Sequence, residues 1–196
     1  MSFEYFETLC PEVGSKERYV LKHSSITTPD GKPRSFVVFE YYCPLPSCDC
    51  RRVKVKFFDL GDPNAPAVAV ASILYGWERA RHYAKTSDDP KFCASLARGM
   101  FAPDEDRGPD CHIFLRFFQH LLKKEPTASM FPRHYRLFKE AARRELEADP
   151  SAKLFLPERG DLVMDEPWPD GLGLIGLPTD AVKVAPPGGG EKKPEV

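Results

Sequence analysis

Residues 41–53 read YYCPLPSCDCRRV and place three of the six cysteines of the chain within eight positions. The segment before them, 34–43, is rich in aromatic and β-branched side chains, and the segment after them, 51–60, alternates between apolar and basic side chains. Both patterns favour β-strands. Two strands joined by so short a loop predict an antiparallel hairpin whose tip carries the cysteines.

The remaining pattern predicts more strands first and helices afterwards. A short strand is expected over 18–23, and a third hairpin strand over 66–75 follows the turn residues 61–64. After Gly76 the apolar period changes from two to about 3.6 residues. Helices are expected over 77–85, from Pro90 to about Gly99, from Cys111 to Leu122, and from about Pro132 to Ala148. The fold class is therefore α+β: an antiparallel β-meander with a metal-stapled hairpin tip, packed by about four helices.

The length of 196 residues predicts one domain with extensions. We expect a single α+β domain over 1–148, in which residues 1–16 form an irregular N-terminal arm. Residues 149–184 are rich in Pro and Gly and are predicted to be an extended segment that packs on the domain or on a partner. Residues 185–196 are predicted to be a disordered tail.

The cysteines of the hairpin tip are predicted to bind zinc. Cys48 and Cys50 are two apart on an extended chain and therefore point to the same side, while Cys43 ends the preceding strand. Structural zinc sites need about four ligands, and the predicted fourth is Cys10, because LCPEVGS at 9–15 looks like a zinc knuckle whose second cysteine is replaced by Val13. The alternatives are a reduced structural cluster and a redox-labile thiol pair.

Basic side chains lie beside the predicted zinc tip. Arg51, Arg52, Lys54 and Lys56 line the hairpin and are candidate contacts for a nucleic acid or a protein partner, since basic and aromatic side chains together suit nucleic-acid binding. A solvated sheet face is the alternative. The 28 Lys and Arg against 29 Asp and Glu argue against a surface built as a whole for polyanions.

Several sequence segments resemble one family. The C-x4-C-D-C-R-R-V block at 43–53, YGWE at 75–78 and HYRLFK at 134–139 resemble a family of uncharacterised prokaryotic proteins. The resemblance implies a shared domain over roughly 34–140. It implies no established activity.

Two classes of protein are not expected. GLGLIG at 171–176 fits the dinucleotide motif, but prolines flank it where a strand and a helix are needed, so no nucleotide cofactor is predicted. No window approaches the roughly 18 apolar residues of a membrane span, and the start MSFEYFE lacks the features of a signal peptide. We expect no membrane association and a cytoplasmic protein, in which thiols stay reduced.

These features together predict a zinc-stabilised, non-enzymatic interaction module that binds a protein or a nucleic acid. One alternative is a metal-dependent hydrolase or nuclease with a structural thiol site, in which Glu40, Asp59 and Glu78 form an acidic cluster. The other is a structural subunit of a larger assembly.

Overall fold

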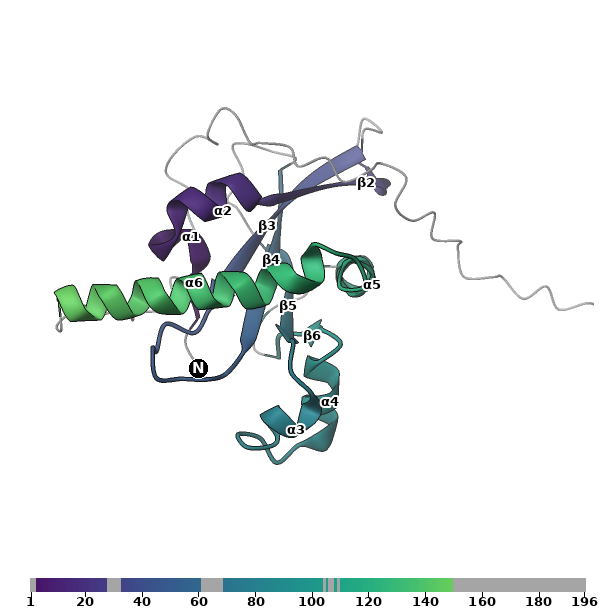
Figure 1. The fold of residues 1–196 in the computed structure, drawn as a ribbon. Helices are drawn as coiled ribbons and strands as arrows, with labels where there is room; N and C mark the ends of the chain where they lie inside the picture. Colours follow the sequence, from purple (N-terminus) through teal and green to yellow (C-terminus); the bar gives the residue numbers. More distant parts are fainter. Residues whose placement is uncertain are drawn as a thin grey trace, which may run out of the picture.

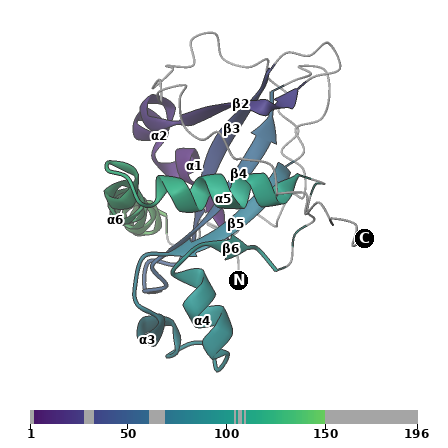
Figure 2. The same cartoon turned by 90° about the vertical axis from the view of Figure 1, so that its right-hand side faces the viewer.

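The computed structural model describes residues 3–27, 33–60, 69–103, 105, 108 and 110–149. It has an antiparallel sheet with α5 and α6 lying across one face, and α3 and α4 form a lobe beyond one end of the sheet (Figures 1 and 2). The predicted α+β class is confirmed. The strands are β1 (Glu4–Tyr5), β2 (Tyr19–Thr27), β3 (Pro33–Tyr42), β4 (Arg52–Asp59), β5 (Ala69–Gly76) and β6 (Met100–Phe101). The helices are α1 (Phe6–Leu9), α2 (Pro11–Glu17), α3 (Ala80–Tyr83), α4 (Pro90–Leu96), α5 (Cys111–Leu121) and α6 (Thr127–Ala148).

The centre of the sheet is the predicted meander β3-β4-β5. Tyr42 lies opposite Val53 at the end of β3, and Val53 lies opposite Tyr75 on β5. The short strand β6 continues the sheet beyond β5, while β1 and β2 both pair with β3 at its other edge. With neighbours on both edges, β3 is central, which accounts for its apolar residues on both faces.

The main core lies between the sheet and the two long helices. Along β4, alternate apolar side chains point to the helices, and Lys54 and Lys56 point to the other face. Aromatic rings from α5 and α6 complete this core, for example Phe114, which lies 4.8 Å from the ring of Phe36. The opposite face carries a smaller apolar cluster made of Val37, Phe39, Tyr41 and Phe58.

Helix α3 begins later than the sequence predicts, and α6 begins earlier. Of the helix expected over 77–85, the structure forms only Ala80–Tyr83, which is α3. Residues 77–79 lie outside it, and the amide of Glu78 donates to the Tyr83 hydroxyl at 3.0 Å. The last helix starts at Thr127, so the predicted start at Pro132 is wrong and this proline lies inside α6. Burial of Met130 and Phe131 in the core favours the additional turn despite the missing N–H group.

The N-terminal segment is not the irregular arm that was predicted. It contains β1, α1 and α2, and Phe6 is buried in the main core. Of the predicted C-terminal segments, only Asp149 belongs to the described residues, so the expectations for 150–184 and 185–196 lie outside them. Among the described residues, no helix has the length and apolar character of a membrane span.

A buried ion cluster joins α2, β3 and α6. His134 is 1% exposed, and its Nδ1 lies 2.9 Å from Glu40 Oε2 while its Nε2 lies 3.1 Å from Glu17 Oε2. Carboxylate oxygens at both ring nitrogens favour the imidazolium form, in which both nitrogens donate, although Arg133 Nη2 also lies 3.3 Å from Nε2. The Tyr42 hydroxyl donates to Glu40 at 2.6 Å, and Arg133 forms an ion pair with Glu17.

This cluster makes stability depend on pH. Burial alone would lower the pKa of His134, but the hydrogen bonds and charges of Glu40 and Glu17 raise it above its ordinary value. A raised pKa in the folded state stabilises the fold fully below the ordinary pKa of about 6.5, and this stabilisation is lost as pH rises through the raised value. The free energy of unfolding, measured by denaturant titration, should therefore fall between mildly acidic and mildly basic pH.

The matched control for that prediction is Glu40→Gln, which keeps the volume of the side chain and removes its charge. Its stability should be lower at mildly acidic pH and should fall less as pH rises. Parallel curves for the two proteins would show that His134 is not charged in the fold.

Candidate metal centre

The loop between β3 and β4, residues 43–51, is called the thiol loop here. Pro44 is buried and Pro46 stands in a turn, in which the amide of Cys48 donates to the carbonyl of Leu45 at 3.0 Å. Arg51 closes the loop with a φ of 45°. Its left-handed conformation is held by the Tyr83 hydroxyl, which donates to the Arg51 carbonyl at 2.9 Å.

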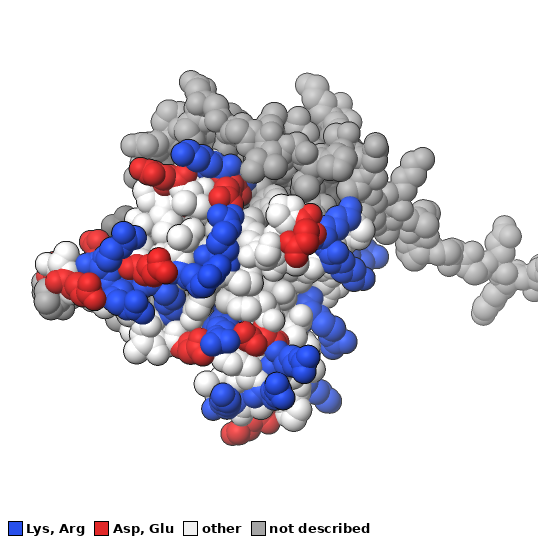
Figure 3. Space-filling model, viewed as in Figure 1, with Lys and Arg blue, Asp and Glu red and all other residues white. Residues whose placement is uncertain are grey.

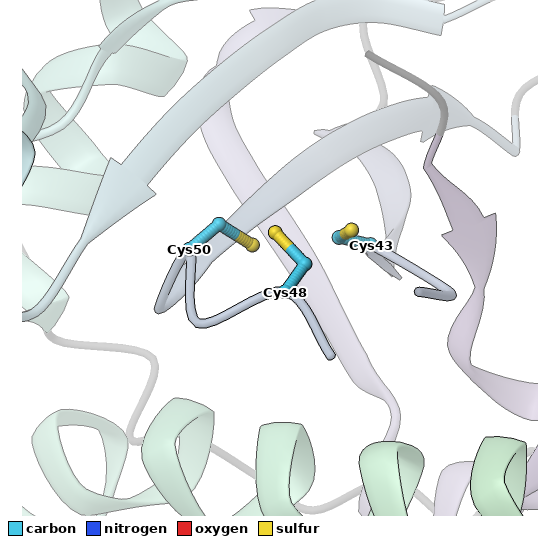
Figure 4. Close-up of side chains that lie close together, drawn as sticks. All are labelled: Cys43, Cys48 and Cys50. Atoms are coloured by element: carbon cyan, nitrogen blue, oxygen red, sulfur yellow. The ribbon is translucent and has the colours of Figure 1, made fainter. Parts of the chain in front are cut away.

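The loop brings three of the four predicted ligands together. The sulfurs of Cys43, Cys48 and Cys50 all lie within 4.8 Å of one another. In Figure 4 the sulfurs of Cys48 and Cys50 point toward each other, and Cys43 stands beside them. Zinc–sulfur bonds of about 2.3 Å put neighbouring sulfurs of a tetrahedral site about 3.8 Å apart, so a small inward movement suffices to hold one ion. Within the described residues, this is the one group of three or more His, Cys, Asp or Glu side chains whose ligand atoms all lie within 4.8 Å of one another.

The three thiols are not equivalent. Cys43 and Cys50 are 1% and 8% exposed, whereas Cys48 is half-buried. A hydrogen bond from Cys50 lowers the pKa of Cys43 to about 7 against the effect of burial, with further help from the Leu45 amide and the charge of Lys139. The same hydrogen bond and burial raise the pKa of Cys50. Within this hydrogen-bonded pair, Cys43 is favoured as the thiolate and Cys50 as the thiol, and thiolate is the form that binds metal.

Helix α6 also contacts the thiol loop, through Tyr135 and Lys139. The Tyr135 hydroxyl donates to the Cys48 carbonyl at 3.0 Å, and the Lys139 ammonium donates to the Leu45 carbonyl. Residues four apart lie on the same face of a helix, so one face of α6 fixes the loop at two points. The Trp77 ring packs against Tyr135 with 5.2 Å between centroids. Neither Tyr135 nor Lys139 was predicted as a site residue, because their spacing in HYRLFK places them on one helix face but does not indicate which loop they contact.

Cys10 is not one of the grouped thiols. It lies between α1 and α2, where its amide donates to the Phe6 carbonyl at 3.0 Å and its own carbonyl accepts from Gly14 at 2.9 Å. Burial raises the pKa of its thiol. The segment predicted to form a zinc knuckle is instead the start of α2, and Val13 packs against the core. A role of Cys10 as fourth ligand stays a prediction.

The predicted basic contact residues have partners inside the molecule. Lys54 and Lys56 lie 2.7 and 3.0 Å from the carboxylate of Glu105, which also accepts from Ser72. Arg51 pairs with Asp49 at 2.7 Å and with Glu78 at 2.8 Å, and Arg52 is buried. Elsewhere, basic and acidic side chains are interspersed along α6 (Figure 3). These contacts differ both from free basic contacts for a partner and from the solvated sheet face given as the alternative, because Lys54 and Lys56 are half-buried and paired with Glu105.

The acidic cluster considered for a hydrolase does not form. Glu40 binds His134 and Tyr42, Asp59 pairs with Arg34, and Glu78 pairs with Arg51. Each carboxylate contacts a different partner. The ligand atoms of the three do not lie within 4.8 Å of one another, as a shared metal site would require.

Comparison with protein-family models, with curated proteins and with solved structures found no match for this chain. The candidate centre is therefore interpreted from its own chemistry.

The Glu105 contacts lead to a stability prediction. Glu105→Gln keeps the size of the side chain but leaves the half-buried ammonium groups of Lys54 and Lys56 without a counter-charge, and it should lower the free energy of unfolding by about 1 kcal/mol. Denaturant titration measures this. The exposed Glu140→Gln on α6 is the matched control and should have no effect. Equal stability of both variants and the wild type would mean that the lysines are solvated and available to a partner.

Proposed function

We propose that the protein is a zinc-stabilised interaction module that contacts a protein partner. The observation that carries the proposal is the convergence of Cys43, Cys48 and Cys50 at the end of the central hairpin. Thiolates are soft ligands that favour zinc over magnesium or calcium. Because all six cysteines are free, the three sulfurs are available to a metal ion.

A metal ion at this point would act on the register of the sheet. The thiol loop joins β3 and β4 where Tyr42 and Val53 are paired, and its ligands stand on both sides of the loop. A bound ion links the end of one strand to the start of the next, and free energy of binding to such a site is also free energy of folding. The role that this geometry supports best is stabilisation of the hairpin, with the metal taking no part in a reaction.

The proposed contact point is the outer side of the same loop. Among the residues that the structure describes, Leu45 is the one large hydrophobic residue that is exposed, at 42%. It lies between two cysteines, so metal binding would fix its backbone before a partner arrives, and pre-organisation improves affinity. A protein partner is favoured over a nucleic acid, since the four predicted basic contacts are paired or buried.

Metal content tests the central part of the proposal. The full chain purified under reducing conditions should hold about one equivalent of zinc, and Cys48→Ser should lose the zinc together with thermal stability because a ligand is missing. The control is Cys111→Ser, which removes a half-buried thiol on α5 outside the cluster and should keep the zinc. Wild-type protein free of zinc, with a melting temperature that Cys48→Ser leaves unchanged, would identify the cluster as a set of reduced structural thiols.

A second variant tests the predicted fourth ligand. If Cys10 binds the metal, Cys10→Ser should weaken zinc binding as much as Cys48→Ser does, and the absorption spectrum of the cobalt-substituted protein should lose thiolate-to-metal intensity. Full zinc affinity and an unchanged cobalt spectrum in Cys10→Ser would mean that a ligand other than this thiol fills the fourth position.

A further inference from the structure

Lys139 is a buried lysine that has no acidic partner among the residues that the structure describes. Its side chain comes from α6 and is 7% exposed. Its ammonium donates to the Leu45 carbonyl and lies 5.2 Å from the centre of the Tyr135 ring. In the part of the chain that the structure describes, no carboxylate lies within ion-pair distance of it. Burying an ammonium without a counter-charge is unfavourable, so its presence here needs an explanation.

The groups able to supply that negative charge are the thiols of the proposed zinc site. Lys139 contacts the thiol loop at Leu45, between Cys43 and Cys48, and Cys43 and Cys50 are the two buried members of the cluster. A neutral thiol cluster would leave the ammonium unpaired. A thiolate cluster without metal would instead gather several negative charges in one buried place.

A divalent ion resolves both problems. Three thiolates around one divalent ion, with a neutral ligand in the fourth position, leave a single negative charge, and one ammonium cancels it. We propose that Lys139 is the counter-cation of a divalent three-thiolate centre, and that it strengthens metal binding by neutralising the loaded site. This inference rests on the proposed function, and it makes Lys139 a positioning residue that does not itself bind the metal.

The hydrogen bond of Lys139 serves the same centre. Its acceptor is the carbonyl of Leu45, which follows Cys43 by two residues in the thiol loop. The ammonium therefore holds the loop between the first two ligands, while Tyr135 holds the carbonyl of Cys48 one helical turn away. Charge and tether have to be separated by experiment, because both would weaken in a simple truncation.

Substitutions at 139 separate the two contributions. Lys139→Gln keeps an N–H donor for the Leu45 carbonyl and removes the charge, whereas Lys139→Arg keeps the charge. Arg136→Gln removes the same charge from an exposed position of the same helix and is the matched control. Zinc affinity of each full-length protein would be measured by competition with a chromophoric chelator, at one pH and ionic strength under reducing conditions.

We expect Lys139→Gln to bind zinc about 10- to 100-fold more weakly than the wild type, which is the usual effect of removing a group that supports metal ligands. Lys139→Arg should stay within about threefold of the wild type, and Arg136→Gln within about twofold. Tyr135→Phe removes the hydrogen bond to the Cys48 carbonyl without changing any charge, and its zinc affinity should also stay within about threefold of the wild type. If the contacts of α6 with the loop were merely structural, Tyr135→Phe would weaken zinc binding as much as Lys139→Gln does.

Two results would overturn the inference. One is a folded Lys139→Gln protein with the zinc affinity of the wild type. The other is a folded Lys139→Arg protein that has lost zinc as completely as Cys48→Ser, and this second result can be obtained even where Lys139→Gln does not fold. Wild-type protein that binds no zinc would overturn the proposed function itself, so the two failures are distinguishable.

Discussion

The imidazolium of His134 fixes the position of α6, and the candidate metal centre depends on that position. Its ring is held between carboxylates from α2 and β3, so segments that lie far apart in the sequence meet at one buried charge. Neighbouring residues of a helix are turned by about 100° around its axis. Once His134 faces Glu40, the next residue, Tyr135, is directed to the thiol loop, and Lys139 follows one turn later on the same face.

Ionic contacts in this fold have two different roles. Those of Lys54 and Lys56 join β4 to Glu105 and remove positive charge that would otherwise be offered to a partner. Lys139, in contrast, pairs with no carboxylate among the described residues and donates to the Leu45 carbonyl in the thiol loop. The distinction matters for function, because a basic residue with an internal acidic partner stabilises the fold, while a buried one without such a partner indicates where negative charge is expected.

Local features could be predicted from the sequence, and non-local ones could not. The hairpin of β3 and β4 follows from alternation and turn residues, and the three thiols that converge lie within eight positions, so their meeting is a property of one loop. The predicted helix start at Pro90 is likewise a local feature, since the side chain of the preceding Asp89 accepts from the amides of Lys91 and Phe92. The start of α6 was misplaced because proline is a common first residue of helices, and only the packing of the preceding turn shows otherwise. Glu105 and Lys139 reach their partners across 51 and 94 residues, and no short pattern reports such contacts.

The short span of the thiol loop has a consequence for the order of folding. Closing the eight-residue span from Cys43 to Cys50 costs little chain entropy compared with closing one of 94 residues. During synthesis, the three proposed zinc ligands leave the ribosome together, long before α6 is synthesised. The ion can then be captured by the nascent hairpin, and the helix closes over a loop that is already shaped. Metal supply during synthesis would thereby influence how much of the chain reaches the native fold.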